Sequence, residues 1–539
     1  MQGIQLNKWR QSVAEACTSQ NRPCQANVKP HAHGPRYVLT LVLLLCFATA
    51  LTMQGQTFTS LVNFDEANGS WPARMTLVQG LDGKLYGTTF GDPNSGNKTS
   101  SGTVFKITIS GALTTIYTFC SQPNCMDGVN PNGGLVLGTD GNFYGTTSFA
   151  GGGNFGGTVF KTTPAGKLTT LYNFCSQPNC TDGSAPIGPL IQATDGNFYG
   201  TTQTGGAHPN SDGGGGTVFK ITPSGVLTVL YSFCSHSNCT DGEAPFGGVI
   251  QAADGDLYGT TSAGGPVTKA CPPAPAGCGT VFKITTAGAF TSLHDFHFGT
   301  DPEADVVQAS DGNFYGTTGL GGGGKQCSPD GSRGCGTVYK MKPGGLTTTL
   351  YSFCTRSGCP DGATPVSPLL QATDGNFYST ARGGGEGTSP GDGTVFKITP
   401  SGALTVLHSF VGPDGNGAAS GLVQATDGNF YGTTWHGGTA KACDPPPDGG
   451  CGTVFKLSVG LRPLVKTLPT SGNVEAKVFI LGTDLSGTTA VDFNGTPARF
   501  TVVSPTEIKT TVPSGATAGT VTVRTPKGTL KSNVPFRVH

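Results

Sequence analysis

Short runs of alternating apolar and β-branched residues recur along most of the chain, and turns rich in Gly, Asp and Pro separate them. Between 189 and 233 the runs are PLIQAT, FYGTT, GTVFKIT and LTVLYSF. A DGN turn joins the first two runs and a PSG turn joins the last two, as turns join the strands of β-hairpins. None of the runs has the 3.6-residue apolar period of a helix. The pattern therefore predicts four short β-strands in this segment.

The same four-strand unit occurs seven times. Its DG turn begins at Asp82, Asp140, Asp195, Asp254, Asp311, Asp374 and Asp427, and its GTVFK-type run begins at Gly102, Gly157, Gly216, Gly279, Gly336, Gly393 and Gly452. Successive DG aspartates lie between 53 and 63 residues apart. Four antiparallel strands repeated seven times are typical of a β-propeller, whereas an open β-solenoid is the alternative.

The two ends of the repeat region complement each other. The last unit ends at GTVFKL (452–457) without a fourth strand, and a matching strand, TFTSLVNF (57–64), precedes the first DG turn. We expect the N-terminal strand to complete the last sheet, which would leave no open sheet edge. The predicted fold is therefore all-β, with a seven-bladed β-propeller of four-stranded blades over 57–457 that the N-terminal strand closes.

A different pattern follows the repeats. Runs such as VFILG (478–482), VDFNGTPA (491–498) and GTVTV (519–523) alternate with Pro/Gly turns as far as His539. Over so short a segment, this arrangement predicts a small immunoglobulin-like β-sandwich at 461–539.

The amino end has the features of a signal peptide. A mildly basic leader precedes the apolar run YVLTLVLLLCFATALTM (37–53), and Ala48-Thr49-Ala50 supplies a small-residue cleavage pattern. Residues 1–50 are therefore predicted to be a signal peptide with a long N-terminal leader, and the true start codon is left open by that length. An uncleaved signal anchor is the alternative, and only it would give the mature chain a membrane span. The mature protein is expected to be extracytoplasmic, either secreted or at the cell surface.

Composition narrows the classes of function. The chain has 86 Gly among 539 residues but no net charge, and 9% of its residues are aromatic. Disordered chains usually combine high net charge with few aromatics, so we expect a folded, turn-rich protein. Without residues 1–50 the balance is 27 basic to 31 acidic residues. Such a chain lacks the basic surface of a nucleic-acid-binding protein.

Beyond residue 50 the chain has 14 cysteines, and each has another cysteine close by in the sequence. An even number in an exported chain favours disulfides, and zinc ribbons, the alternative, prefer a shorter spacing with two pairs converging on one ion. The predicted pairs are Cys120–Cys125, Cys175–Cys180, Cys234–Cys239, Cys271–Cys278, Cys327–Cys335, Cys354–Cys359 and Cys443–Cys451.

The DGNFYGTT, GTVFKITPSG and LTxLYSF motifs of 57–457 resemble the GloVer repeat, the Gloeobacter–Verrucomicrobia tandem repeat of exported bacterial proteins. That resemblance implies export and association with the envelope or surface, and it implies no established catalytic activity. The P-x-x-G, FNG-x-x-A and VP-x-G motifs of the last segment resemble the IPT/TIG domain. Domains of that family usually act as spacers or binding modules.

Strand order predicts where a ligand would bind. The short DGN and PSG turns must share one end of each antiparallel unit, so the long, cysteine-containing connections share the other end. Loops on a rigid scaffold commonly carry function. Four residues of these loops, His208, Arg382, Trp435 and His436, are the candidate ligand-binding residues, although ordinary exposed loop residues are the alternative.

No catalytic residues, metal ligands or cofactor are predicted, because the histidines match neither HExxH nor a GxSxG context. Calcium at the loop aspartates Asp127, Asp182, Asp241 and Asp361 is an alternative, but a single Asp before Gly is commonly a turn residue. The turn aspartates and the GTVFK lysines are expected to form a repeated structural contact.

Three functions remain open. The first is a secreted or surface-associated, non-enzymatic binding or adhesion scaffold whose long-loop face recognises an extracellular glycan or protein. The second is an extracellular polysaccharide hydrolase or lyase with acidic residues in the propeller funnel. Such an enzyme would break the repeats at particular units, and EADV (303–306) and the YSTA copy (378–381) are the visible exceptions to otherwise uniform repeats. The third is a purely structural surface array.

Overall fold

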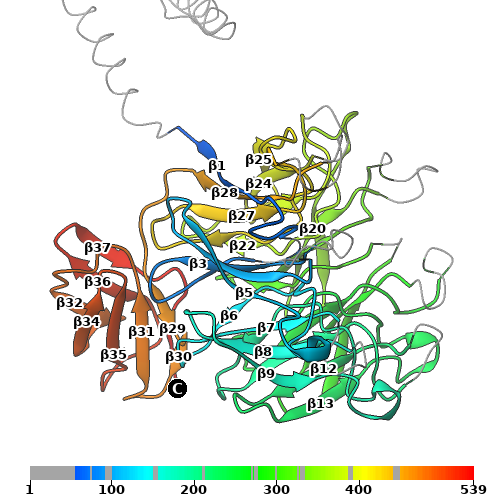
Figure 1. The fold of residues 1–539 in the computed structure, drawn as a ribbon, viewed down its shortest axis with the longest axis horizontal. Helices are drawn as coiled ribbons and strands as arrows, with labels where there is room; N and C mark the ends of the chain where they lie inside the picture. Colours follow the sequence, from blue (N-terminus) through cyan, green and yellow to red (C-terminus); the bar gives the residue numbers. More distant parts are fainter. Residues whose placement is uncertain are drawn as a thin grey trace, which may run out of the picture. The chain divides into compact units, whose positions relative to one another are not determined.

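In the computed structural model, the described residues are 55–539 except 73, 75, 92–99, 150–155, 209–212, 269–270, 272–276, 298–299, 325–326, 328–333, 387–391, 441–442 and 444–448. Gln56–His539 form one compact unit (Figure 1). The predicted signal peptide (1–50) lies outside the described residues. Within the described part of the chain, no helix has the length and apolar character needed to cross a membrane.

The described residues before 459 form seven four-stranded antiparallel sheets, numbered here in chain order. Sheets 1 to 4 contain β2 (Val78–Gln79), β3 (Leu85–Thr89), β4 (Thr103–Ile107) and β5 (Leu113–Thr118); β6 (Val136–Leu137), β7 (Phe143–Thr147), β8 (Thr158–Thr162) and β9 (Leu168–Asn173); β10 (Ile191–Gln192), β11 (Phe198–Thr202), β12 (Thr217–Ile221) and β13 (Leu227–Ser232); and β14 (Val249–Gln251), β15 (Leu257–Thr261), β16 (Thr280–Ile284) and β17 (Phe290–Asp295). Sheets 5 to 7 contain β18 (Val307–Gln308), β19 (Phe314–Thr318), β20 (Thr337–Met341) and β21 (Thr347–Ser352); β22 (Leu370–Gln371), β23 (Phe377–Ala381), β24 (Thr394–Ile398) and β25 (Leu404–Ser409); and β26 (Val423–Gln424), β27 (Phe430–Thr434), β28 (Thr453–Ser458) and β1 (Thr57–Asn63).

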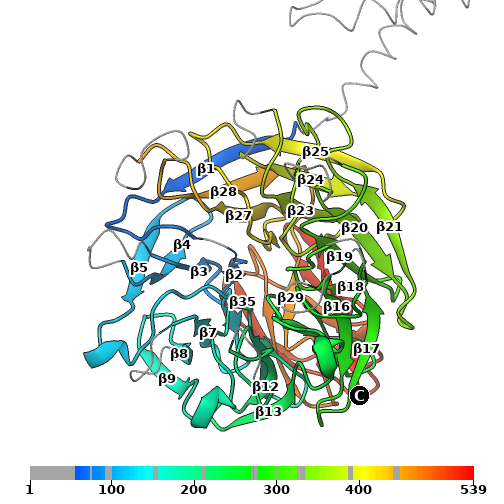
Figure 2. The ribbon, with the colours of Figure 1, turned by 90° about the vertical axis from the view of Figure 1, so that its right-hand side faces the viewer.

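Figure 2 shows these sheets arranged in chain order around a common centre, so the repeat region is β-propeller-like. In each sheet, the strand that follows the DG turn is fully buried. A glycine in most of these strands leaves room for a ring on the neighbouring strand: a Cβ on Gly200 would lie 2.8 Å from the Phe219 ring. Part of the glycine excess therefore serves close packing inside the sheets.

Aromatic contacts join one sheet to the next. The Tyr of one DGNFYGTT motif stacks on the Phe of the following copy, as Tyr144 does on Phe198 with ring centroids 4.0 Å apart. The equivalent stacks are Tyr86–Phe143, Tyr258–Phe314 and Tyr378–Phe430. This second aromatic position of the motif therefore builds the core between sheets.

A side-chain amide makes a second repeated contact between neighbouring sheets. The Gln that ends the first strand accepts a hydrogen bond from a backbone N–H in the preceding sheet. The pairs are Thr139–Gln192, Thr194–Gln251, Ala253–Gln308, Ser310–Gln371, Thr373–Gln424 and, from sheet 7 to sheet 1, Thr426–Gln79. In sheet 2 the equivalent residue is Leu137, which lies in an apolar cluster instead.

The N-terminal strand lies in the last sheet. β1 pairs antiparallel with β28 from Thr57–Ser458 to Asn63–Thr453. Phe64 follows the strand and is fully buried. Sheet 7 is thus made from two segments about 400 residues apart. The last repeat unit supplies three of its strands and the N-terminal segment supplies the fourth, as the repeat pattern predicts.

The C-terminal segment forms two further four-stranded sheets around one buried core. They contain β29 (Lys466–Leu468), β31 (Lys477–Leu481), β35 (Glu507–Thr511) and β34 (Phe500–Ser504), and β33 (Thr496–Pro497), β32 (Ala490–Phe493), β36 (Val521–Thr525) and β37 (Gly528–Lys531). A parallel pair, β30 (Ser471–Gly472) and β38 (Arg537–Val538), completes the domain.

This domain contacts the DG turns. The Thr506 hydroxyl donates a hydrogen bond of 2.8 Å to the Leu81 carbonyl, and Arg537 Nη1 donates one of 2.9 Å to the Ala252 carbonyl. A third contact joins the hydroxyls of Thr483 and Thr426 at 2.8 Å. These turns belong to sheets 1, 4 and 7, so the C-terminal domain contacts several sheets at their short-turn end.

Candidate ligand site at the central opening

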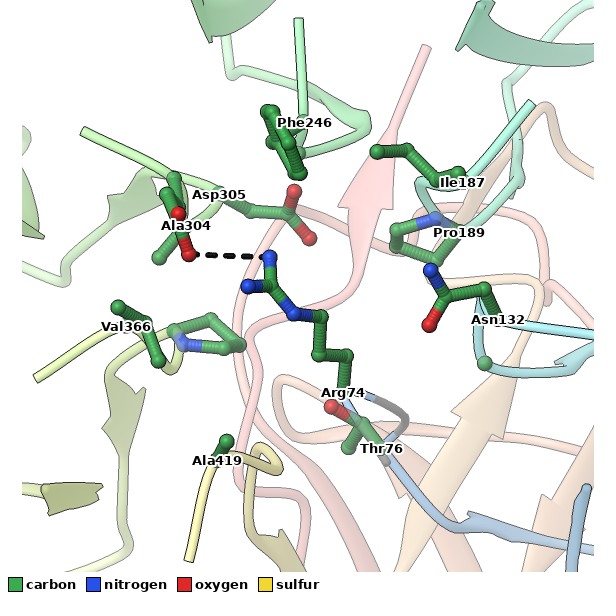
Figure 3. A pocket seen from close by; sticks show the side chains of 14 residues that line it. Arg74, Thr76, Asn132, Ile187, Pro189, Phe246, Ala304, Asp305, Val366 and Ala419 are labelled. Atoms are coloured by element: carbon green, nitrogen blue, oxygen red, sulfur yellow. Dashed lines mark ion pairs between the residues drawn. The ribbon is translucent and has the colours of Figure 1, made fainter. Parts of the chain in front are cut away.

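All seven sheets contribute the segment before their first strand to one small cavity of about 50 Å³ (Figure 3). Each segment links a long loop to the first strand, so the cavity lies at the long-loop end. Its lining residues are Arg74, Thr76, Asn132, Gly134, Ile187, Pro189, Phe246, Gly247, Glu303, Ala304, Asp305, Val366, Pro368 and Ala419.

Equivalent positions of the seven repeats meet in this cavity. One lining residue of every repeat stands eight positions before the aspartate of its DG turn: Arg74, Asn132, Ile187, Phe246, Glu303, Val366 and Ala419. No two of these residues are the same, although the strand motifs beside them are nearly invariant. The repeats therefore diverge where their chains converge, and this variation is a sequence signal that marks the cavity.

An ion pair crosses the cavity between sheets 1 and 5. Arg74 Nη1 lies 2.9 Å from Glu303 Oε2, and the two side chains are only 26% and 14% exposed. The Arg74 guanidinium also lies over the Phe246 ring, 5.2 Å from its centroid (Figure 3). Three sheets thus hold the guanidinium in place.

Asp305 is the second acidic residue of the cavity and belongs to the EADV segment that breaks the repeats. Its carboxylate accepts a hydrogen bond from the Gly248 N–H, yet burial raises the pKa of Asp305 to about 6. Glu303, in contrast, has the Arg74 guanidinium beside it. Two acidic groups two residues apart therefore lie in different electrostatic environments.

Beside the cavity, loop residues of sheets 1, 6 and 7 form a cluster of aromatic and basic side chains, here termed the arginine–tryptophan cluster: Trp71, Arg382, Trp435 and His436. The Arg382 guanidinium lies over the Trp435 ring at 5.1 Å. Trp435 stacks on His436 at 5.4 Å, and His436 meets the Trp71 ring edge-on at 5.8 Å. Desolvation and the positive charge of Arg74 lower the pKa of Arg382, which places the cluster near the cavity.

Three of the four loop residues singled out from the sequence are therefore neighbours, and their role in binding stays a prediction. His208 lies half-buried in a loop of sheet 3, without a described contact to the cluster. The sequence did not single out Trp71, Arg74 and Phe246 as candidate binding residues. Trp71 and Arg74 precede the first DG turn, and Phe246 occupies a variable position that appears unremarkable until the repeats are aligned.

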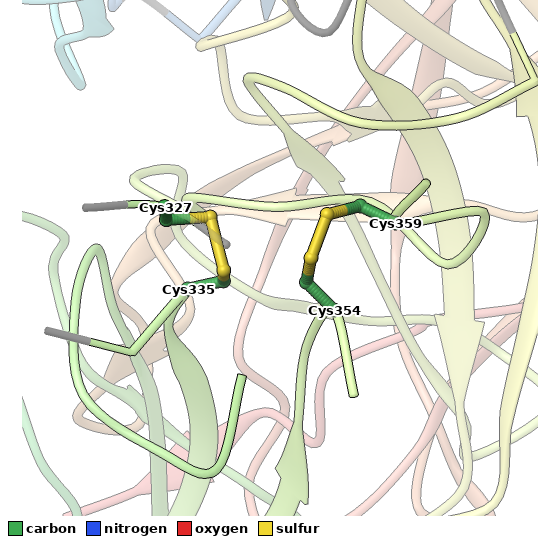
Figure 4. Close-up of side chains that lie close together, drawn as sticks. All are labelled: Cys327, Cys335, Cys354 and Cys359. Carbon is green, nitrogen blue, oxygen red and sulfur yellow. A yellow bond between two sulfur atoms is a disulfide. The ribbon is translucent and has the colours of Figure 1, made fainter. Parts of the chain in front are cut away.

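The structure contains the seven disulfides expected from the sequence. Three lie beside the short 3₁₀ turns Pro123–Cys125, Pro178–Cys180 and Ser237–Cys239. Sheet 5 carries two disulfides, Cys327–Cys335 and Cys354–Cys359, and their four sulfur atoms lie within 4.8 Å of one another (Figure 4). So many disulfides indicate an extracytoplasmic location.

Four loop aspartates have structural partners. Asp127, Asp182, Asp241 and Asp361 are buried, and each accepts a hydrogen bond of 2.7 to 2.8 Å from a Tyr hydroxyl of the preceding strand. In sheet 6 the same contact joins His408 Nε2 and Asp414 at 2.8 Å. These contacts tie the loops to the outer strands.

The expected contact between turn aspartates and GTVFK lysines is present in five sheets: Asp140–Lys161, Asp195–Lys220, Asp254–Lys283, Asp311–Lys340 and Asp427–Lys456. In sheet 1, Asp82 pairs with Lys84 instead, because Lys106 donates to the Pro164 carbonyl. Burial alone would raise the pKa of Asp140, but hydrogen bonds from Lys161 and Asn142 lower it to about 2.

Comparisons with known proteins agree with the repeats. The model of the Gloeobacter/Verrucomicrobia repeat matches residues 48–271, 179–328 and 325–478, and that of the IPT/TIG domain matches 464–538. No curated protein shows significant sequence similarity to the chain.

Solved structures match the chain at low identity and with TM-scores below 0.5. An inactive virginiamycin B lyase from Staphylococcus aureus, determined with quinupristin, is 13% identical, with a TM-score of 0.47 over 75% of this chain and 99% of the lyase. A luciferin-regenerating enzyme is 11% identical, with a TM-score of 0.39 over 76% of this chain and 98% of that enzyme. Scores this low support no transfer of activity.

Proposed function

Since this chain belongs to the Gloeobacter/Verrucomicrobia repeat family and ends in an IPT/TIG domain, we propose that it is a secreted or surface-associated, non-enzymatic binding scaffold. The proposed ligand is a glycan, bound at the long-loop end beside the central cavity. The proposal requires no cofactor, and its IPT/TIG domain acts as a spacer or second binding module.

The proposed scaffold is a closed, seven-bladed propeller. Two contacts between the first and last sheets support closure: β1 pairs with β28, and Gln79 accepts a hydrogen bond from Thr426 in the same way as the Gln of each successive sheet. A closed ring gives the loops a rigid base, which keeps the entropic cost of ligand binding low.

The arginine–tryptophan cluster is the observation that carries the binding proposal. It gathers guanidinium, indole and imidazole groups from three separate sheets beside a cavity that all seven sheets line. Concave sites with a few convergent polar groups are the usual form of ligand sites. The abundance of N–H donors suits a ligand rich in oxygen acceptors, as glycans are.

A glycan array probed with the exported chain tests the proposal. We expect binding to a restricted set of glycans, and Trp435→Ala should weaken it at least tenfold. His208→Ala is the matched control, since His208 is a loop residue with no described contact to the cluster. Equal binding by both variants, or capture of a protein with no glycan bound, would contradict the proposal.

One observation favours a second function, cleavage of a polysaccharide by a hydrolase or a lyase. Glu303 and Asp305 lie in one cavity, with Arg74 beside the first and a raised pKa on the second. Two carboxyl groups in one site are the usual acid and base of glycoside hydrolases. Release of reducing sugar from any polymer, abolished by Asp305→Asn, would replace the first proposal with this one.

A further inference from the structure

We propose that Arg382 is an oxyanion-binding residue, so that the glycan recognised at the long-loop end is an acidic one that bears carboxylate or sulfate groups. This inference rests on the proposed glycan-binding function and names the class of glycan. It starts from the way Trp435 holds the Arg382 side chain.

The Arg382 guanidinium carbon lies 5.1 Å from the centroid of the Trp435 ring, and His436 stacks on the same ring. The N–H groups of a guanidinium lie in its plane, in the fork geometry that binds planar oxyanions with two hydrogen bonds. Arg382 is solvent-exposed as a residue, so its side chain is open to a ligand.

The charges around Arg382 compensate its charge only in part. No ion pair to Arg382 is found among the described residues, whereas the neighbouring Arg74 is paired with Glu303 at 2.9 Å. Arg74 also repels Arg382, whereas Glu303, which is paired with Arg74, attracts it. An anionic group on a ligand would therefore supply the partner that the protein does not.

Two further donors lie in the same cluster. The indole nitrogens of Trp71 and Trp435 are buried and have no hydrogen-bond partner among the described residues. A buried N–H without an acceptor is unfavourable, so an acceptor on a ligand would relieve that cost. This observation is independent of charge and points to an oxygen-rich ligand at the same place.

General electrostatic attraction does not explain acidic selectivity in this chain. Beyond residue 50 the sequence has 27 basic and 31 acidic residues. A polyanion is therefore not drawn to the protein as a whole, and any preference for it must come from a local group. Arg382 is the group that the geometry provides.

Binding to two matched pairs of polymers tests the inference: polygalacturonate against its neutral methyl ester, and dextran sulfate against dextran. We expect at least tenfold tighter binding to one acidic polymer than to its neutral counterpart, with affinity that falls as salt rises. The pair that shows the preference identifies carboxylate or sulfate as the bound group. Arg382→Gln should remove the preference, and Arg382→Lys should restore only part of it.

Arg356→Gln is the matched control, because Arg356 is an exposed arginine in the Cys354–Cys359 loop of the same face. Equal affinity for acidic and neutral polymers, or the same loss in both Gln variants, would overturn the role of Arg382 while leaving glycan binding intact. If Trp435→Ala also leaves all glycan binding unchanged, the proposed function fails with it.

Discussion

Tyr339 stands where the other six GTVFK-type runs have phenylalanine. Its hydroxyl is buried, has no hydrogen-bond partner among the described residues, and burial raises its pKa. A buried hydroxyl without a partner costs about 1–3 kcal/mol. We therefore expect Tyr339→Phe to stabilise the protein by about 1–2 kcal/mol, measured as a higher midpoint of guanidinium unfolding.

A second Tyr→Phe change serves as its control. The Tyr315 hydroxyl donates a hydrogen bond of 2.9 Å to the Asp311 carboxylate, in the same sheet. Tyr315→Phe should therefore destabilise the protein by about 1–2 kcal/mol. If both variants changed the unfolding midpoint in the same direction, the hydrogen bonding of the tyrosine hydroxyl would not be what controls stability at these positions.

Asp305 makes stability depend on pH. Burial raises its pKa from 3.8 to about 6 in the folded protein. Between these values the folded state binds the proton and the unfolded state does not, so stability falls as the pH rises from about 4 to about 6. Asp305→Asn removes this loss, and its stability relative to wild type should rise by up to about 3 kcal/mol over that interval.

Unfolding titrations at several pH values measure the effect. Asp195→Asn is the control with the opposite sign. Burial would raise the pKa of Asp195, but hydrogen bonds from Asn197 and Tyr199 outweigh burial and lower it. The wild-type carboxylate therefore contributes stability that is lost as the pH falls. A constant difference between Asp305→Asn and wild type would contradict the assignment.

At the scale of elements, sheet 7 depends on the N-terminal strand. β1 covers the edge of β28, Phe58 stacks on His408, and Phe64 is fully buried. Deleting 57–64 exposes that edge and loses a buried aromatic, which alone costs about 3–5 kcal/mol. We expect a large fall in melting temperature relative to a variant that begins at Gly55, and an unchanged temperature would argue against the pairing.

The pairing of the loop cysteines can also be tested. All 14 cysteines beyond residue 50 are paired in the structure. Thiol titration of the exported protein after unfolding should find almost no free thiol. Seven or more free thiols per chain would contradict the seven pairs, and peptide mapping would then identify the open ones.

At the scale of the whole molecule, the C-terminal domain protects particular DG turns. A Cβ on Gly83 would lie 2.7 Å from Thr506, whereas Gly196 in sheet 3 has no neighbour within 4 Å. Removing 461–539 should raise hydrogen exchange in the turn that contains Gly83 and leave the turn that contains Gly196 unchanged. Equal changes in both turns would contradict a local contact between the domains.

Repetition within the sequence was sufficient to predict much of the fold of this protein. The strands, their hairpin turns and the incomplete last unit follow from alternation and turn chemistry, which act between near neighbours. The disulfide pairs were predictable for the same reason, since each joins cysteines five to eight residues apart. The contact between turn aspartates and GTVFK lysines also followed, because each aspartate lies in the turn just before the strand that pairs with the lysine strand, as Asp140 does before β7.

The central site could not be predicted in this way. Arg74 and Glu303 are over 200 residues apart and meet because the sheets turn their first strands toward one centre. The angle between sheets depends on packing, such as the Tyr144–Phe198 stack, and not on any local pattern. The sequence by itself therefore determined the repeats, their strands and their disulfides. Only the tertiary structure decided which variable residues meet at the centre, because their positions depend on how whole sheets pack against one another.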